Sequence, residues 1–202
     1  MKQKSKSMKC GVKPGNQPTN RTLKDLISEY IKTWNNQKCN NSCYTMCDDF
    51  EEAKGLYKDP VDKFLERCVC NRRRHQRCLS QKAVDNAVEK LMQTDVLSRK
   101  YENFEELYDF IYECIGRGST GISYSTVYDT AARMGYSFSP QVLPDKYVYV
   151  HRKLVESAKH ILGKKCIIED NRRIKRDLFV QVESDFNKMD ALHIENFLCV
   201  GV

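Results

Sequence analysis

The chain has 202 residues, of which 41% are apolar and 30% charged, and a formal net charge of +7. This length and composition indicate a compact globular protein with a substantial core. They exclude a membrane protein, because no apolar run reaches the roughly 18 residues that a spanning helix needs. The N-terminus is basic without a following apolar segment, so we expect no secretory signal and a cytoplasmic location.

The positive charge is concentrated at the start of the chain. Residues 1–24 hold seven Lys and Arg residues and no acid, and elsewhere 27 basic residues balance 27 acidic ones. Pro14, Gly15 and Pro18 disfavour regular structure here. We therefore expect a flexible basic arm over residues 1–21, followed by a single α-helical domain over residues 22–202. The arm could add salt-sensitive affinity for nucleic acid, or serve only as a solvated tail.

Most of the remaining sequence has apolar residues at helical spacing. Thr22 and Asp25 form a box-like helix start, and Ser80 and Asn103 are good N-caps. The helices that we predict cover residues 22–34, 48–57, a segment starting at Pro60, 80–99, 103–115, 124–134, 145–162 and 190–198. Residues 166–170 fit a short strand or an extended link, and residues 171–186 fit either a helix or a strand. The predicted fold class is mostly α, a helical bundle.

Ten cysteines are many for this length, and in a cytoplasmic protein we expect reduced thiols. A zinc site needs four ligands at regular spacing. The spacing here is irregular, so we expect no metal and no other cofactor. The residues that could act as ligands are Cys39, Cys43, Cys47, Cys68, Cys70, His75 and Cys78.

The segment RGSTGISYSTVYDTAARMG, Arg117 to Gly135, joins two predicted helices through glycines and hydroxyl residues. Glycines permit a tight turn with close backbone approach, and N–H groups at a helix N-terminus attract phosphate. The residues expected to form this site are Arg117, Gly118, Gly121, Ser123, Ser125 and Thr126. A glycine-rich turn without any ligand is the alternative.

This segment, about residues 103–135 with its flanking helices, resembles the helix-hairpin-helix motif of DNA-binding proteins. The hairpin is Gly121-Ile122-Ser123, and Thr126 and Thr130 lie on the second helix. The motif usually has a second glycine where this chain has Ser123. The resemblance implies contact with the phosphates of duplex DNA.

A second basic feature is RCVCNRRRHQRC, Arg67 to Cys78, with five arginines and no acid. Arginine forks bind phosphates bidentately. We therefore expect Arg72, Arg73, Arg74, His75 and Arg77 to contact nucleic acid, unless they form only a solvated basic loop.

The sequence leaves three functions open. The leading hypothesis is a DNA-binding protein. The chain is also similar to helix-hairpin-helix DNA glycosylases, which carry a catalytic Asp about 20 residues beyond the hairpin, and Asp145 has that position. That resemblance implies base excision, but no lysine stands just after the hairpin, where members with lyase activity have one. The third hypothesis is a protein-interaction module without DNA affinity.

Residues 60–163 are similar to a group of bacterial proteins of unassigned activity, which implies a common fold. The stretches that carry this resemblance are His75-Gln76-Arg77, Tyr128-Asp129-Thr130-Ala131 and Val148-Tyr149-Val150-His151.

Overall fold

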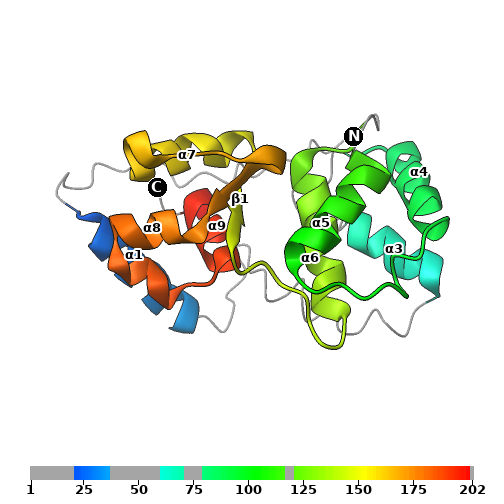
Figure 1. Cartoon of the computed structure of the whole chain (residues 1–202), viewed down its shortest axis with the longest axis horizontal. Coiled ribbons are helices and arrows are strands. Elements are labelled where there is room, and N and C mark those ends of the chain that lie inside the picture. The colour runs from blue at the N-terminus through cyan, green and yellow to red at the C-terminus, as the bar shows by residue number, and fades with distance from the viewer. Residues whose placement is uncertain (1–20, 37–59, 71–78, 117–120, 201–202) are drawn as a thin grey trace, which may run out of the picture.

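The computed structural model describes residues 21–36, 60–70, 79–116 and 121–200, and the regular structure within them is almost all helical. This confirms the mostly α class. The predicted helix over residues 48–57 lies outside the described residues. Figure 1 shows two lobes side by side. The helical lobe contains α3 (Val61–Val69), α4 (Gln81–Met92), α5 (Phe104–Ile111) and α6 (Tyr124–Ser137).

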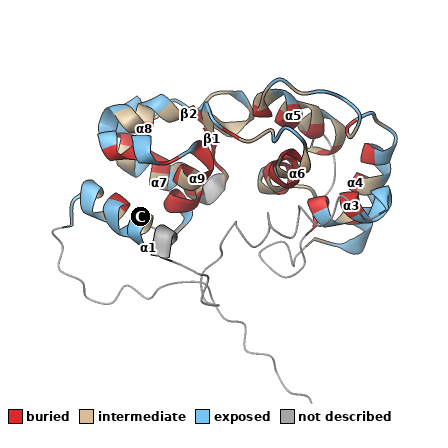
Figure 2. Ribbon diagram, turned by 90° about the horizontal axis from the view of Figure 1, so that it is seen from below, coloured by how far each residue is buried: buried red, intermediate tan, exposed pale blue. Residues whose placement is uncertain are grey.

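The second lobe combines helices with a small antiparallel sheet. Its helices are α1 (Leu23–Asn36), α7 (Arg152–Leu162), α8 (Arg176–Val182) and α9 (Ala191–Val200). The sheet pairs β1 (Tyr147–Tyr149) with β2 (Arg173–Lys175), Val148 lying opposite Ile174. Among the described residues, the buried apolar side chains accordingly form two clusters, one in each lobe. Figure 2 shows these buried positions on the sides of the helices that face each other within a lobe.

Helix α1 belongs to the second lobe although it comes first in the chain. Its Ile27 is fully buried in the cluster of that lobe. The hydroxyl of Tyr30 accepts a hydrogen bond of 2.8 Å from the Asn196 amide, and the Tyr30 ring meets Phe197 edge-on. From residue 21 onwards, the described segments therefore lie first in the second lobe, then in the helical lobe, and then in the second lobe again.

The predicted helix starts in the helical lobe are confirmed, but the predicted end of α4 is wrong. Ser80 accepts from the Ala83 N–H, and Asn103 accepts from the Glu106 N–H. Helix α4 ends at Met92 rather than near Arg99. The Thr94 hydroxyl donates to the carbonyl of Leu91 and ends the helix, and the following turn buries Val96 in the core.

Helices α5 and α6 pack against each other as a pair. A π-helical turn, Tyr112–Gly116, extends α5 towards the connection. At the far end of α6, Gly135 lies so close to the backbone of Val142 that a Cβ there would collide with the Val142 carbonyl. The Val142 N–H donates to the Gly135 carbonyl at 2.9 Å, which returns the chain along α6.

The prediction of a helix that begins at Asp145 is wrong for the residues before Arg152. Residues 147–149 form β1, and α7 begins only at Arg152. The sequence Tyr-Val-Tyr-Val alternates between the two lobes: Tyr149 belongs to the cluster of the helical lobe, and Val148 and Val150 to the other. Because a strand sends successive side chains to opposite faces, β1 can serve both cores at once.

The structure shows which regular elements form over residues 171–186, which the sequence fits to either a helix or a strand. Residues 171–186 form a 3-10 turn, β2, α8 and a further 3-10 turn, so the segment is a strand followed by helices. Residues 166–169 are extended, and Glu169 bridges to Arg173. The predicted last helix is confirmed as α9.

Candidate nucleic-acid interface

The N-terminus of α6 is capped by hydroxyl groups. The Thr126 N–H donates to the Ser123 Oγ at 3.2 Å. That Oγ also lies 2.8 Å from the Ser125 hydroxyl and 3.0 Å from the Thr126 hydroxyl. Thr126 is buried, whereas Ser123 and Tyr124 are exposed. The part of this helix start that a ligand can reach is therefore Ser123 to Ser125.

Gly121 has a conformation that matches the predicted tight turn. Its φ is +90°, which L side chains rarely adopt, and a Cβ there would lie 3.0 Å from the Ala83 Cβ. Ile122, the middle residue of the hairpin, packs against the core of the helical lobe. Because Ala83 is in the first turn of α4, the turn before α6 and the start of α4 lie side by side.

Several predicted contact residues lie outside the described part of the chain. They are Arg117, Gly118, Arg72, Arg73, Arg74, His75 and Arg77. The last five fall between α3, which ends at Val69, and Leu79, which precedes the cap of α4. Ser80, which follows this segment in the sequence, caps α4, and the first turn of α4 lies beside Gly121.

Asp145 occupies a different setting from the one expected. It is exposed, in the extended segment just before β1, and does not begin a helix. The local reason is its neighbours: the β-branched and aromatic residues that follow form a strand between two apolar clusters.

A hollow opens between the two lobes at the start of α6. It spans about 220 Å³ when its open mouth is counted. The side chains and backbone around it come from α5, α6, β1 and the turn before β2. The lining residues are Tyr108, Tyr124, Ser125, Tyr128, Tyr149, Val150, His151, Asn171 and Arg172. Asp145 is not among them.

Stacked side chains form one wall of the hollow. The Tyr112 and Tyr124 rings stack with centroids 5.5 Å apart, and their hydroxyls lie 3.2 Å apart. The Arg172 guanidinium lies 4.7 Å from the centre of the Tyr124 ring. This places a cation beside the first residue of α6, although 48 residues separate the two positions in the chain.

Buried tyrosines fill the space between the lobes. Tyr149 of β1 lies 4.4 Å from the Tyr108 ring and 5.2 Å from the Tyr128 ring, measured between centroids. Burial raises the pKa of all three phenols above the ordinary value, so each keeps its proton at neutral pH. The Tyr128 hydroxyl is buried and has no hydrogen-bond partner among the described residues.

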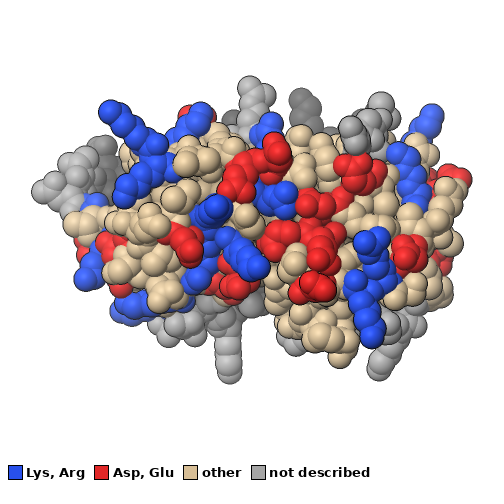
Figure 3. Space-filling view, viewed as in Figure 1, with Lys and Arg blue, Asp and Glu red and all other residues tan. Residues whose placement is uncertain are grey.

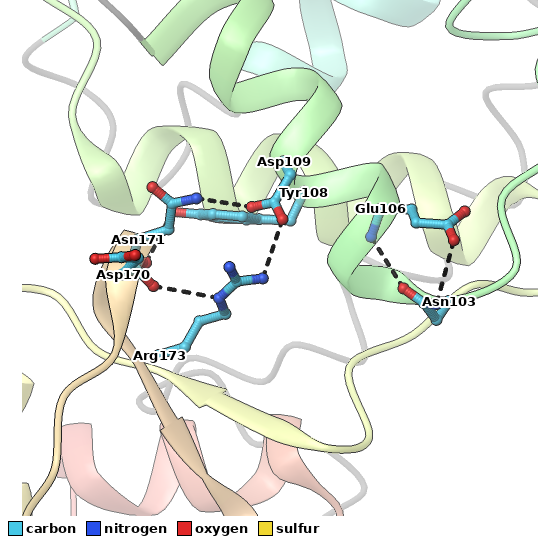
Figure 4. Close-up of polar contacts among 7 residues, drawn as sticks. All are labelled: Asn103, Glu106, Tyr108, Asp109, Asp170, Asn171 and Arg173. Carbon is cyan, nitrogen blue, oxygen red and sulfur yellow. Dashed lines mark hydrogen bonds and ion pairs between the residues drawn. The ribbon is translucent and has the colours of Figure 1, made fainter.

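A polar clasp joins the turn before β2 to α5, as Figure 4 shows. Asp109 accepts from the Asn171 amide at 2.8 Å and from Arg173 Nη1 at 3.1 Å. Arg173 Nε also donates to the Asp170 carbonyl, and the Tyr108 hydroxyl donates to the Asn171 carbonyl. Burial lowers the pKa of Arg173, but nearby Asp109 and Tyr149 outweigh it and raise the pKa overall, so the guanidinium stays charged.

The charge on this side of the molecule is uneven. Figure 3 shows acidic side chains gathered over α5 in the middle of the face. Glu102 and Glu106 at the start of α5 are exposed, and Asp109 is half-exposed. Such a surface repels phosphate, so nucleic acid would have to approach the start of α6 without crossing the exposed face of α5.

Arg172 and Asn171 were not among the predicted site residues. The signal in the sequence is weak: Asn is one of the few residues that tolerate left-handed backbone, so Asp-Asn marks a turn. Nothing local in the sequence indicates that this turn lies against Tyr124, because that contact depends on how the two lobes meet.

No group of three or more His, Cys, Asp or Glu side chains in the described ranges could hold a metal ion. No helix in the described part of the chain is both long and apolar enough to cross a membrane. Comparisons with protein-family models, curated proteins and solved structures found no match to this chain.

Proposed function

We propose that this protein binds duplex DNA by its phosphate backbone, through the N-terminus of α6 and the arginine-rich segment that precedes α4. The observation that carries the proposal is the contact between Gly121 and Ala83. It brings the start of α6 next to the start of α4, the helix that follows Arg72–Arg77 in the sequence.

The start of α6 has the chemistry for a phosphate. N–H groups in the first turn of a helix have no partner within the helix, and the helix dipole adds about half a positive charge there. The Ser123 and Ser125 hydroxyls lie 2.8 Å apart at the same place, so one of them donates to the other and the second has a proton left for a ligand. Such a site binds any backbone phosphate and reads no base, so it predicts affinity without strong sequence preference.

The basic segment would supply most of the binding energy. Each phosphate neutralised by Lys or Arg releases counterions, so binding weakens steeply with salt. Five predicted contact residues, four of them arginines, lie within Arg72–Arg77. We therefore expect affinity in the micromolar range at low salt, falling by more than tenfold as the salt is raised to about 200 mM.

The other two hypotheses receive less support. The base-excising alternative rests on Asp145, which is exposed in an extended segment and does not line the hollow. The protein-interaction alternative predicts no DNA affinity, so a measurement of duplex binding distinguishes it from the proposal.

The sharpest test adds a negative charge without removing a helix cap. Asp is as good an N-cap as Ser, so Ser123→Asp keeps α6 intact but puts a carboxylate where the phosphate would lie. Asn103→Asp is the matched control, because it adds the same charge at the N-cap of α5, the other helix of the pair.

Binding to a fluorescent duplex is measured by anisotropy across a salt series, with thermal melts to verify folding. We expect Ser123→Asp to bind at least about fivefold more weakly than Asn103→Asp at low salt, the size of one charge acting at a helix terminus. Absence of wild-type binding, or equal affinities of the two variants, would disprove the proposal.

A further inference from the structure

The turn that leads into β2 has an unusual backbone. Asn171 and Arg172 both have positive φ, at 56° and 59°. Non-glycine residues in this region cost on the order of 1 kcal/mol or more each, so surrounding contacts must hold them there. Asn tolerates the conformation, but a long side chain such as Arg does not favour it.

Contacts from α5 hold the turn in place. Asp109 accepts from the Asn171 side chain at 2.8 Å, and the Tyr108 hydroxyl donates to the Asn171 carbonyl at 3.4 Å. Asp109 also pairs with Arg173, on the other side of Arg172. One carboxylate therefore fixes the residues on both sides of Arg172.

The two neighbouring arginines have different surroundings. Arg173 is neutralised by Asp109 and is mostly buried. The Arg172 guanidinium carbon lies over the Tyr124 ring and the residue lines the hollow, and it forms no ion pair or hydrogen bond with the described residues. A guanidinium held over an aromatic ring keeps its charge and has N–H donors left for a ligand such as a phosphate.

We propose that Arg172 is a further phosphate-contacting residue, and that Asp109 positions it by holding the turn over residues 170–172. This inference rests on the proposed function, because the phosphate belongs to the DNA backbone held at the start of α6. It extends that site from the hairpin to the second lobe, so that both lobes contact the same duplex.

The first test removes the charge of Arg172. Arg172→Gln is compared with Lys164→Gln, which removes an exposed charge beyond the C-terminal end of α7 in the same lobe. We expect Arg172→Gln to weaken duplex binding about fivefold at low salt and to make the slope of log affinity against log salt shallower by about 0.9, which corresponds to one phosphate contact. Lys164→Gln should match the wild type.

The second test separates positioning from charge. Asp109→Asn removes a negative charge near the site, so electrostatics alone predicts tighter binding. If Asp109 positions Arg172, binding becomes weaker instead. Asn171 and Arg173 donate to different oxygens of Asp109, and an Asn side chain keeps an acceptor at only one of these two positions. Glu102→Gln, which neutralises an exposed carboxylate on the same acidic face, should leave the affinity unchanged or slightly raised.

The outcomes distinguish this inference from the proposed function. Wild-type binding that is sensitive to Ser123→Asp, together with an Arg172→Gln variant that behaves like Lys164→Gln, overturns the role of Arg172 alone. Tighter binding by folded Asp109→Asn overturns the positioning role. Absence of DNA binding by the wild type overturns both this inference and the proposed function.

Discussion

At the scale of single residues, Glu195 of α9 is a carboxyl group whose surroundings favour its protonated form. It is partly buried, and the charge of Asp129 on α6 in the other lobe acts on it. Burial, with a smaller contribution from Asp129, raises the pKa of Glu195 from 4.5 to about 8. At neutral pH the side chain is therefore mostly protonated, so the two lobes meet without a second full negative charge beside Asp129.

This pKa shift predicts how stability depends on pH. Between pH 4.5 and about 8 the folded state keeps a proton on Glu195 that the unfolded state releases, so the free energy of unfolding falls as pH rises through this window. Glu195→Gln should remove that fall, and at pH 8 should be more stable than the wild type by on the order of 3 kcal/mol.

Urea denaturation at pH 5, 6, 7 and 8 measures the effect. Near pH 5 the two proteins should differ little, because the wild-type carboxyl is already neutral. Glu89→Gln, at an exposed position of α4, is the control and should follow the wild type at every pH. A parallel decline of Glu195→Gln and wild type with pH would contradict the prediction.

At the scale of elements, the sequence predicts helix starts well because capping is a local interaction. At four helix starts, the side-chain oxygen of the capping residue accepts a hydrogen bond from the backbone N–H three residues later, as the spacing predicts. These residues are Thr22, Ser80, Asn103 and Ser123. The failures come from tertiary structure. The run Tyr147 to Val150 is apolar on every side because it lies between two cores, and apolar residues on all sides fit a buried helix as well as a strand.

Gly135 allows the segment after α6 to pack closely against that helix, a requirement that the sequence does not reveal. A Cβ there would collide with the carbonyl of Val142 and approach Leu107 Cδ2 to 3.1 Å. We expect Gly135→Ala to lower the free energy of unfolding by about 2 kcal/mol, because the backbone of the returning segment cannot move aside as a flexible side chain could.

Gly163→Ala provides the comparison, measured by the same denaturation curves. It has positive φ but no atom within 4 Å of the added Cβ, so it tests backbone strain alone. Its φ of 55° is combined with a ψ of −129°, a region almost restricted to glycine, so we expect backbone strain to cost about 1–3 kcal/mol there. The close-contact explanation fails if Gly135→Ala leaves the free energy of unfolding unchanged or raises it, as the higher helix propensity of alanine alone would do.

At the scale of the whole molecule, the candidate site depends on how the lobes meet, which local sequence patterns do not encode. The hairpin residues Gly121 and Ser123 were predictable from composition and spacing. Arg172 was not predictable, because it belongs to the candidate site only through its contact with Tyr124 across the lobe boundary. The clasp around Asp109 is likewise built from residues more than 60 positions apart.

The clasp predicts a measurable coupling between the lobes. Asp109 and Arg173 form an ion pair of 3.1 Å whose side chains are 42% and 16% exposed, so solvent screens it only in part. A double-mutant cycle with Asp109→Ala and Arg173→Ala should give a coupling free energy of about 1 kcal/mol, at the upper end for pairs near the surface.

The matched control is the pair Glu156–Lys159 on α7, whose side chains are 77% and 54% exposed. Its coupling should be about 0.3 kcal/mol and should vanish in 0.5 M NaCl, because salt screens exposed charges. The Asp109–Arg173 coupling should persist in that salt, since one partner is largely withdrawn from solvent. A coupling that vanishes with salt as the control does would show that the clasp is an ordinary surface pair and does not hold the lobes together.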